Sequence, residues 1–239
     1  MNCNGLKGKI ESLLAVLNYL DNPTCICLQE TKLNYSGTVK LDEYQIFEKV
    51  RQTKGGGLLT AVRHNLHPLL ILSGEDDIEI HVVQIQLFNK KIRIINAYGP
   101  QECSQAQRPT EYQQTLIINF WNAMEREIID AQDEGCWILI ELDANAKVGD
   151  TVVDGDPNRQ SPNGKLLLDM MERPNLNILN SSKRDQGKIT RERKTYEGVE
   201  KSIIDFIIVS VELEDFLDKM IIDDERKLVL TKFSHTKKV

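Results

Sequence analysis

The sequence predicts an α+β fold in which two mixed or antiparallel β-sheets stack on one another and helices cover them from outside. Segments with a strand pattern outnumber helical segments, and several neighbouring strands have the spacing of hairpins. These two features favour a sandwich over a doubly wound parallel sheet. With 239 residues, 41% of them hydrophobic, the chain is long enough for one globular domain with a sizeable core, spanning residues 1–239.

The first quarter of the chain predicts one helix and three strands. Residues 7–20 carry apolar side chains at helical spacing, namely Leu6, Ile10, Leu13, Leu14, Leu17 and Leu20. The sequence Asp-Asn-Pro ends this helix. Residues 24–28 form a short apolar run typical of a buried strand, and a strand is also predicted at 44–48. A run of three glycines leads into a further strand at 58–62.

The middle of the chain predicts a hairpin, a long helix and another strand. Segments 78–88 and 91–98 flank Asn-Lys, a two-residue hairpin signal. A helix opens at Pro109 and closes near Gly135. Its apolar face consists of Leu116, Ile117, Phe120, Trp121, Met124 and Ile128. Residues 136–140 predict the next strand.

The last third predicts a loop, two short helices and one strong strand. Residues 149–164 are rich in Gly, Asp, Pro and Asn, which indicates a surface loop. Short helices are predicted at 165–173 and 211–220, and a strand at 203–209. The sequence shows no internal repeat, interdomain linker or low-complexity tract.

Composition limits the possible locations and partners. The net charge is −6 and the pI about 5.4, without the basic excess usual in nucleic-acid-binding proteins. A set of metal-binding carboxylates would itself make the chain acidic, so a nucleic-acid partner stays possible. No apolar run is long enough to cross a membrane, and the N-terminus lacks a signal pattern. The five cysteines, with Cys25 and Cys27 as core residues, favour reduced thiols and an intracellular location, nucleus or cytoplasm.

Polar residues recur where the predicted strands end. Side chains two residues apart share one face of a strand, so each pair of these residues points the same way. If the strand ends converge, they line a pocket with three carboxylates and no cysteine or histidine ligand. Such oxygen-rich ligation suits Mg²⁺ or Mn²⁺, which would polarise a phosphate for attack by water. The residues are Asn2, Asn4, Glu30, Asn96, Tyr98, Asp143, Asn145 and Asp205.

Several of these residues also have a simpler interpretation. Glu30 or Asn145, taken alone, could be a turn or cap residue. Asp205 is harder to explain that way, because a carboxylate inside an apolar strand is costly unless it is paired. His81 alternates with apolar neighbours and is predicted to be a hydrogen-bonded sheet residue. The acidic run 74–79 is interpreted as a solvated turn.

Five segments carry a resemblance to a known family, and they occur in the right order over essentially the whole chain. They are MNCNGLKGKIESL, CLQETKL, INAYGP, ELDANAKVG and SIIDFIIVS. These segments resemble the motifs of the endonuclease/exonuclease/phosphatase superfamily, most of all those of the endonuclease domain of LINE-type (non-LTR) retrotransposons. The resemblance implies a four-layer α/β-sandwich and Mg²⁺-dependent hydrolysis of phosphodiester bonds. It also implies nicking of target DNA for retrotransposition, with a reverse transcriptase domain in the parent protein.

The resemblance also implies individual roles. Glu30 matches the metal-binding glutamate, and Asn2 matches the asparagine near the metal. Asp143 matches the aspartate that orients or activates the attacking water. Asn145 matches the amide that holds the scissile phosphate, and Tyr98 matches a tyrosine that contacts it.

Four further residues are assigned through the same motifs. Asn4 lies on the face of Asn2, and Asn96 on the face of Tyr98, so both are expected to contribute to substrate binding. Ser202 and Asp205 match a Ser-x-x-Asp motif, in which the serine is assigned to substrate binding. The aspartate is assigned to catalysis and pairs in the family with a C-terminal histidine.

The C-terminus departs from the family pattern. Relatives end in Ser-Asp-His on a final strand, whereas this chain ends in FSHTKKV. We expect that the final strand is missing, that His235 is a loop residue, and that the N-terminus is also shortened within the first strand. Loss of the Ser-Asp-His motif would impair catalysis in this chain.

Two alternatives to a DNA endonuclease stay open. One keeps the fold and the metal but acts as a phosphodiesterase or phosphatase on an inositol phosphate or phospholipid. The other is a catalytically inactive fragment or binding domain. DNA is the expected partner of a monomer, contacted by loops 99–108, 149–162 and 183–198. The last of these carries six basic residues, Lys183, Arg184, Lys188, Arg191, Arg193 and Lys194, although a solvated charged turn would look the same.

Overall fold

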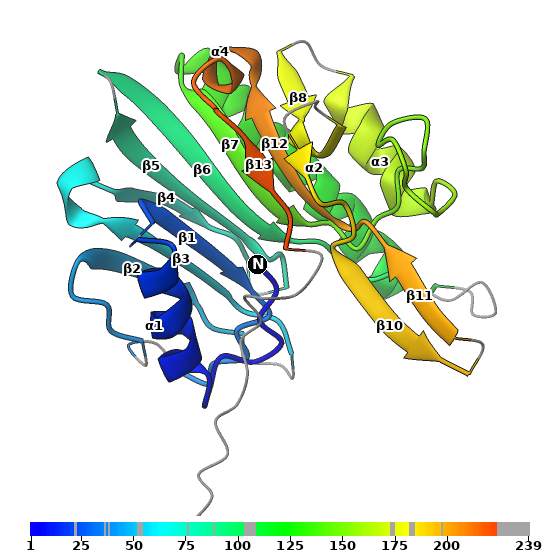
Figure 1. Cartoon of the computed structure of the whole chain (residues 1–239). Coiled ribbons are helices and arrows are strands. Elements are labelled where there is room, and N and C mark those ends of the chain that lie inside the picture. The colour runs from blue at the N-terminus through cyan, green and yellow to red at the C-terminus, as the bar shows by residue number, and fades with distance from the viewer. Residues whose placement is uncertain are drawn as a thin grey trace, which may run out of the picture.

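Two stacked β-sheets form the centre of the computed structural model (Figure 1). The structure describes residues 1–21, 23–35, 37, 39–51, 55–75, 77–87, 89–102, 109–172, 175–181, 185–196 and 198–223. The larger sheet has six strands in the order β4-β5-β6-β7-β12-β8 and is mixed, because β6 and β7 pair in parallel while the other neighbours are antiparallel. The smaller sheet has three antiparallel strands in the order β1-β3-β2.

The strands of the larger sheet come from the middle and the last third of the chain. They are β4 (Leu69–Ser73), β5 (Ile80–Leu87), β6 (Lys90–Tyr98), β7 (Trp137–Asp143), β8 (Leu176–Ile178) and β12 (Asp205–Ser210). The smaller sheet contains β1 (Cys25–Gln29), β2 (Tyr44–Lys49) and β3 (Leu58–Arg63). Two small pairs complete the strands: the hairpin of β10 (Arg191–Thr195) with β11 (Gly198–Ser202), and β9 (Asp185–Gln186) with β13 (Met220–Ile221).

Helices cover the outer faces of both sheets (Figure 1). The helix α1 (Ile10–Tyr19) packs on the smaller sheet, and α2 (Glu111–Asp133) and α3 (Pro162–Met171) pack on the larger one. The remaining helical segments are short: α4 (Val211–Glu214), η1 (His64–Leu66) and η2 (Leu179–Ser181). The order helix, sheet, sheet, helix confirms the predicted four-layer sandwich. No helix in the described part of the chain is both long and apolar enough to span a membrane.

The alternation of side chains along the strands builds three hydrophobic clusters. Leu28 of β1 packs under α1, whereas its neighbour Cys27 points to the opposite face, toward the larger sheet. In β6, Ile94 lies between the two sheets and Ile95 faces α2. The central strands of both sheets are therefore buried on both faces, and polar side chains reach solvent where these strands end.

Most predicted elements occur, with shifted ends. The strand predicted at 136–140 continues to Asp143, because every residue as far as Asp143 pairs with β12 or β6. The helix predicted at 165–173 begins at Pro162, with Ser161 as its N-cap. The helix predicted at 211–220 ends at Glu214. Lys90 already pairs with Leu87, so the hairpin turn lies one residue earlier than predicted.

The sequence analysis missed the edge strands β4 and β8 and the hairpin β10–β11. The hairpin was predicted to be part of a charged loop, because almost all of its side chains are polar and exposed. Its strands are stabilised by backbone pairing from Arg191 opposite Ser202 to Thr195 opposite Gly198, which polar sequence patterns do not reveal.

His81 confirms the prediction of a hydrogen-bonded sheet residue and makes stability depend on pH. Its ring is buried, and Nδ1 lies 3.3 Å from the hydroxyl of Thr60. Burial, and to a lesser degree the charge of Lys49, lowers the pKa of His81 from 6.5 to about 4. The unfolded chain therefore binds more protons than the folded chain between these two values.

We expect the free energy of unfolding to fall as the pH is lowered from 6.5 toward 4, with His81 contributing about 2–3 kcal/mol to the loss. Urea denaturation at a series of pH values measures this slope. His81→Gln should flatten it, and the exposed control His64→Gln should not. An unchanged slope in His81→Gln would contradict the attribution of this pH dependence to His81.

Candidate active site

Three neighbouring strands of the larger sheet end with polar side chains at the same level. Asp143 at the end of β7 pairs with Tyr98 at the end of β6 on one side and with Asp205 at the start of β12 on the other. Tyr98 lies on the same face of β6 as Ile94 and Asn96, and Asp205 lies on the same face of β12 as Ile207 and Val209. These four residues face the smaller sheet. The three side chains therefore project toward the smaller sheet at one rim of the sandwich.

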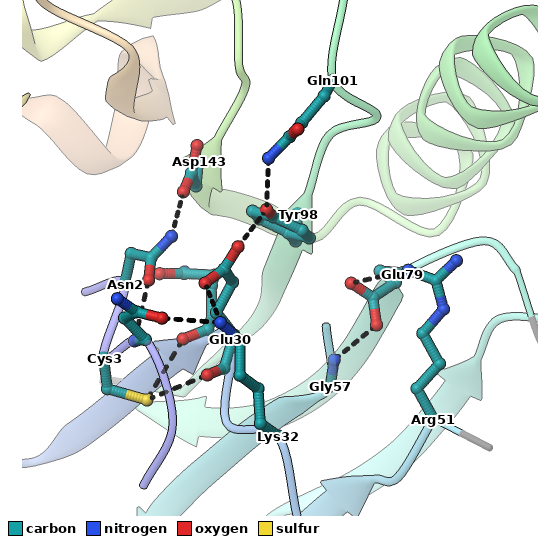
Figure 2. Close-up of polar contacts among 12 residues, drawn as sticks. Asn2, Cys3, Glu30, Lys32, Arg51, Gly57, Glu79, Tyr98, Gln101 and Asp143 are labelled. Atoms are coloured by element: carbon teal, nitrogen blue, oxygen red, sulfur yellow. Dashed lines mark hydrogen bonds and ion pairs between the residues drawn. The ribbon is translucent and has the colours of Figure 1, made fainter. Parts of the chain in front are cut away.

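The smaller sheet contributes Glu30, the residue that follows β1. The hydroxyl of Tyr98 donates a hydrogen bond to Oε1 of Glu30, and Nζ of Lys32 lies 3.1 Å from its Oε2 (Figure 2). The same ammonium donates to Oδ1 of Asn4 at 2.6 Å. One tyrosine hydroxyl thus connects the two sheets at the rim, and a carboxylate from one sheet meets a phenol from the other.

Asp143 is held by two hydrogen bonds. Its Oδ2 accepts from Nδ2 of Asn2 at 2.7 Å, and its Oδ1 accepts from the backbone N–H of Asn145 at 3.3 Å (Figure 2 shows the first). Asn145 in turn donates from Nδ2 to the carbonyl oxygen of Gly99 at 2.9 Å. These bonds fix the orientation of the carboxylate and of the amide, which are the two groups that end the run ELDAN.

These side chains surround one open cavity of about 670 Å³. Residues from the two sheets, the N-terminal segment and the hairpin line it: Met1, Asn2, Cys3, Asn4, Lys9, Glu30, Lys32, Tyr98, Gln101, Asp143, Asn145, Thr190, Arg191, Glu192, Ile204, Asp205 and Asp223. Seven of the nine residues predicted for the site are therefore together. Asp143 and Asn145, the acid and the amide two residues apart at the end of β7, both line this cavity.

Burial and like charge perturb the acids at the rim. Burial first, and the neighbouring Asp205 second, raise the pKa of Asp143 to about 7, although the bond from Asn2 opposes the shift. Burial also raises the pKa of Asp205, against the effect of the Thr190 hydroxyl. Burial and the hydrogen bond to Glu30 raise the pKa of Tyr98. Titratable groups shifted in this way are common in catalytic sites.

The backbone at the cavity is strained. Asn4, Glu30, Lys32 and Asn145 have positive φ angles of 43°, 52°, 50° and 45°. Asparagine tolerates this left-handed conformation, but for Glu30 and Lys32 it costs about 1 kcal/mol or more each. Such strain persists where the surrounding structure fixes a side chain for a task, and here it coincides with residues that line the cavity.

Asn96 and Ser202 do not belong to the cavity, so their assignment to substrate binding is corrected. Asn96 is fully buried between the sheets, where it accepts from Nε2 of Gln29 at 2.8 Å and donates to the carbonyl oxygen of Leu59 at 3.0 Å. Its position on the face of Tyr98 was predicted, but it lies deeper in the sandwich. Ser202 is buried at the end of β11, opposite Arg191.

The network around Asn96 predicts a large effect on stability. Asn96→Ala should lower the free energy of unfolding by about 3 kcal/mol, because it leaves buried groups of Gln29 and Leu59 without partners. Urea denaturation measures the loss. Asn119→Ala, on an exposed position of α2, is the control and should change stability little. A loss below about 1 kcal/mol for Asn96→Ala would contradict a structural role.

Other expectations fall outside the described residues. His235 and the expected C-terminal truncation concern residues 224–239, and Lys183 and Arg184 of the basic loop are likewise outside the described part. Within it, Arg191 lines the cavity. Asp205 begins β12 instead of lying inside a strand, because Ile203 and Ile204 just before it belong to no strand.

Sequence reasoning missed two cations of the site, Lys9 and Lys32, and the acid Glu79. Lys9 donates to the carbonyl oxygen of Cys3 at 2.6 Å. Lys32 follows Glu30 by two residues and contacts its carboxylate, and this spacing could have indicated that the two residues share a site. Glu79 was predicted to be part of a solvated turn. It is instead 2% exposed and accepts from the backbone N–H of Gly57, so the prediction for the acidic run 74–79 was wrong at this residue.

The donor set of the cavity fits a hard divalent cation. Glu30, Asp143 and Asp205 offer carboxylate oxygens and Asn2 offers an amide, while burial raises the pKa of the nearby Cys3 thiol to about 11 and keeps it protonated. No three acidic, histidine or cysteine side chains of the described chain already form a metal cluster. One or two carboxylates together with neutral oxygen ligands are a set that Mg²⁺ accepts.

Comparison with solved structures shows which known proteins share this architecture. The catalytic domain of APE2 from Xenopus laevis matches with a TM-score of 0.69 and 17% identity, over 90% of this chain and 82% of that chain. The endonuclease domain of TRAS1, a telomere-specific non-LTR retrotransposon, matches with a TM-score of 0.58 and 17% identity, over 90% and 85%. The chain has the endonuclease/exonuclease/phosphatase fold. An AP endonuclease from Archaeoglobus fulgidus shares this fold with a TM-score of 0.64 and 14% identity, over 90% and 86%.

No protein-family model matches the sequence, and no curated protein matches it in sequence. The similarity is therefore one of three-dimensional structure, and it confirms the fold that the five sequence segments implied. The activity has to be argued from the cavity itself.

Proposed function

We propose that the chain is the catalytic domain of a Mg²⁺-dependent DNA endonuclease that nicks target DNA by phosphodiester hydrolysis, in the context of retrotransposition. The observation that carries the proposal is the convergence of Glu30, Tyr98, Asp143 and Asn145 from separate segments on one cavity. The fold shared with nucleases and with a retrotransposon endonuclease domain supports it.

Asp143 would position the attacking water and accept its proton. Asn2 and the backbone N–H of Asn145 hold the carboxylate from two sides, which fixes the direction in which it can receive a hydrogen bond. A carboxylate held in a buried position beside a second acid is a stronger base than one in water. The water proton would pass to an oxygen of Asp143 as the water oxygen forms a bond to phosphorus. The P–O bond to one sugar oxygen would break in the same step, and that departing oxygen would take a proton from solvent.

Asn145 and Tyr98 would position the phosphate. One N–H of the Asn145 amide is used by the carbonyl oxygen of Gly99, which leaves the second N–H for a phosphate oxygen in the cavity. The hydroxyl of Tyr98 lies at the same rim and is kept protonated by its raised pKa. Its one proton is donated to Glu30 in the free site, so it would reach the phosphate only when Glu30 turns to the cation. Donors fixed before substrate arrives stabilise charge that develops on the phosphate.

Glu30 and the Asn2 amide are the groups that would hold Mg²⁺ or Mn²⁺. When bound, the cation supplies positive charge that polarises the phosphate. It would also balance the negative charge of the acids that share the cavity. Lys32, which contacts Glu30, would then be free to turn toward a phosphate of the DNA backbone.

A basic groove next to the cavity supports a DNA substrate. A second hollow of about 850 Å³ shares Gln101, Asn145, Arg191 and Ile204 with the catalytic cavity. Four cationic residues line it: Lys147, Arg159, Arg191 and Arg193. A phosphate bound at Asn145 would thus have a basic path for its neighbouring nucleotides, despite the acidic net charge of the chain. Arg191 and Arg193 of β10, within the loop 183–198 expected to contact DNA, line this groove.

Nicking of supercoiled plasmid tests the proposed function. The protein should convert supercoiled plasmid to open circles in the presence of Mg²⁺, and excess EDTA should abolish the reaction. Soluble inositol phosphates and phospholipid vesicles, as alternative substrates, should release no phosphate or headgroup. Hydrolysis of these substrates without nicking would overturn the proposal in favour of a phosphoesterase of the same fold.

A further inference from the structure

A second, smaller cavity lies beside the catalytic one. It has a volume of about 360 Å³ and shares Glu30, Tyr98 and Gln101 with the catalytic cavity. Figure 2 shows its two central residues, Glu79 and Arg51, on the side of Tyr98 away from Asp143. A group that enters this cavity would therefore be the neighbour of a phosphate bound at Tyr98. We call it the Glu79 pocket.

Glu79 and Arg51 present an unused acceptor beside an unused donor. Glu79 is 2% exposed, and its Oε1 accepts from the backbone N–H of Gly57 at 2.5 Å. Its Oε2 has no hydrogen-bond partner among the described residues, and the same is true of Nε of Arg51. Nη1 of Arg51 is 4.0 Å from Oε2, too far for a hydrogen bond. Buried polar atoms are rarely left without partners, so this pair indicates a ligand.

The charges of the pocket disfavour two classes of ligand. Glu30, Asp77 and Glu79 outnumber the guanidinium of Arg51, which disfavours a phosphate or another anion. The guanidinium of Arg51, whose Nη1 lies 4.0 Å from Oε2 of Glu79, disfavours a metal ion at that carboxylate. The remaining class is an uncharged ligand with a donor and an acceptor on one edge.

The walls of the pocket suit a flat ring. Tyr98, Tyr112 and Phe120 provide aromatic surface and Leu116 provides apolar surface, while Glu79 and Arg51 supply the polar edge. A pocket with aromatic and apolar walls and a few fixed polar groups is typical of sites for small heterocycles.

We propose that the Glu79 pocket binds the base of the nucleotide next to the scissile phosphate and selects adenine or cytosine over thymine. This inference rests on the proposed function for its DNA context. Adenine and cytosine carry an amino group that can donate to Oε2 of Glu79, next to a ring nitrogen that can accept from Arg51. Thymine has one N–H between two carbonyl oxygens, so binding it brings a carbonyl oxygen against the carboxylate.

Binding of free nucleosides to the full chain tests the pocket without catalysis. Titrations followed by NMR shifts of the Leu116 methyl groups and the Gly56 amide use deoxyadenosine, deoxycytidine and thymidine as probes. We expect deoxyadenosine and deoxycytidine to bind roughly tenfold more tightly than thymidine. Equal affinities for the three nucleosides, or shift changes confined to residues outside the pocket, would overturn the inference.

Three variants identify the groups responsible. Glu79→Gln should remove the discrimination, and Glu75→Gln, which removes a charge from an exposed position of the same loop, should retain it. Leu116→Trp should weaken binding of all three nucleosides by filling the cavity, and it keeps the test decisive where Glu79→Gln fails to fold. Retained discrimination in folded Glu79→Gln, or unchanged binding in Leu116→Trp, would contradict the assignment.

Mapping of nick sites on a random-sequence plasmid separates the two proposals. Thymine should be depleted at one position beside the nick in the wild type and not in Glu79→Gln. Nucleoside discrimination without any nicking would overturn the proposed function and leave the ligand class in place. Nicking without nucleoside discrimination would overturn this inference alone.

Discussion

Replacing Asp143 with asparagine is expected to lower the rate of Mg²⁺-dependent plasmid nicking by roughly a thousandfold. Asparagine keeps the volume and one acceptor oxygen for the bond from Asn2 but cannot take a proton from water. Removing the charge also relieves the repulsion between Asp143 and Asp205, which face each other across β7 and β12. The variant should therefore be at least as stable as the wild type while losing activity.

Two measurements distinguish this result from simple damage to the fold. Thermal unfolding of Asp143→Asn should occur at or above the wild-type temperature, and its affinity for a DNA duplex should change little. Asp133→Asn removes an exposed carboxylate at the end of α2 and should nick at the wild-type rate. Wild-type nicking by Asp143→Asn would show that another group activates the water.

Replacing Gly99 with alanine is expected to reduce both stability and activity. A Cβ at this position would lie 2.5 Å from the carbonyl oxygen of Ala144, which is backbone and cannot move aside cheaply. Gly99 also donates to the carbonyl oxygen of Asp143 at 2.7 Å and accepts from the side chain of Asn145. Forcing the ends of β6 and β7 apart should cost about 2–3 kcal/mol and displace Tyr98 from Asp143 and Asn145.

A second glycine provides the control. Gly8 has a positive φ of 79°, and a methyl group added there would have no atom within 4 Å, so alanine meets backbone strain but no collision. Gly8→Ala should cost about 1 kcal/mol and leave nicking unchanged at a temperature where it is folded. For Gly99→Ala we expect a loss of nicking of at least tenfold under conditions where circular dichroism shows the folded state. Full activity in folded Gly99→Ala would contradict the proposed coupling between the strand ends.

Local patterns were sufficient to predict residues whose role depends on one strand. The two-residue spacing of Asp143 and Asn145 predicted that both face one side, and both line the cavity. The position of Glu30 after an apolar run predicted a strand end, and β1 ends at Gln29. In these cases the deciding physical factor is the alternation of side chains, which the sequence contains directly.

Residues whose environment depends on distant pairing were harder to predict. Asn96 and Tyr98 share a face, yet Asn96 is buried because β1 and β3 cover that part of β6, whereas Tyr98 extends past their ends. Glu79 belongs to an acidic run that looks solvated, but its carboxylate folds back onto Gly57. No local pattern distinguishes these positions, because the covering segments come from elsewhere in the chain.

Charge distribution reconciles an acidic chain with a DNA substrate. The overall charge of −6 gave no support to a nucleic-acid partner but left it possible. Three of the acids, Glu30, Asp143 and Asp205, are gathered at the cavity, whereas Lys147, Arg159, Arg191 and Arg193 line the adjoining groove. Local charge along the path of the substrate is what a DNA backbone meets within a Debye length. The net charge alone therefore does not argue against the proposed DNA substrate.

Anomalous X-ray diffraction from crystals soaked in Mn²⁺ tests the central claim most directly, because it locates the cation independently of activity. We expect the strongest anomalous peak inside the 670 Å³ cavity, in contact with the carboxylate of Glu30, and its loss in Glu30→Gln crystals. No peak in that cavity at millimolar Mn²⁺, or a strongest peak at a site away from Glu30, Tyr98, Asp143 and Asn145, would contradict the account.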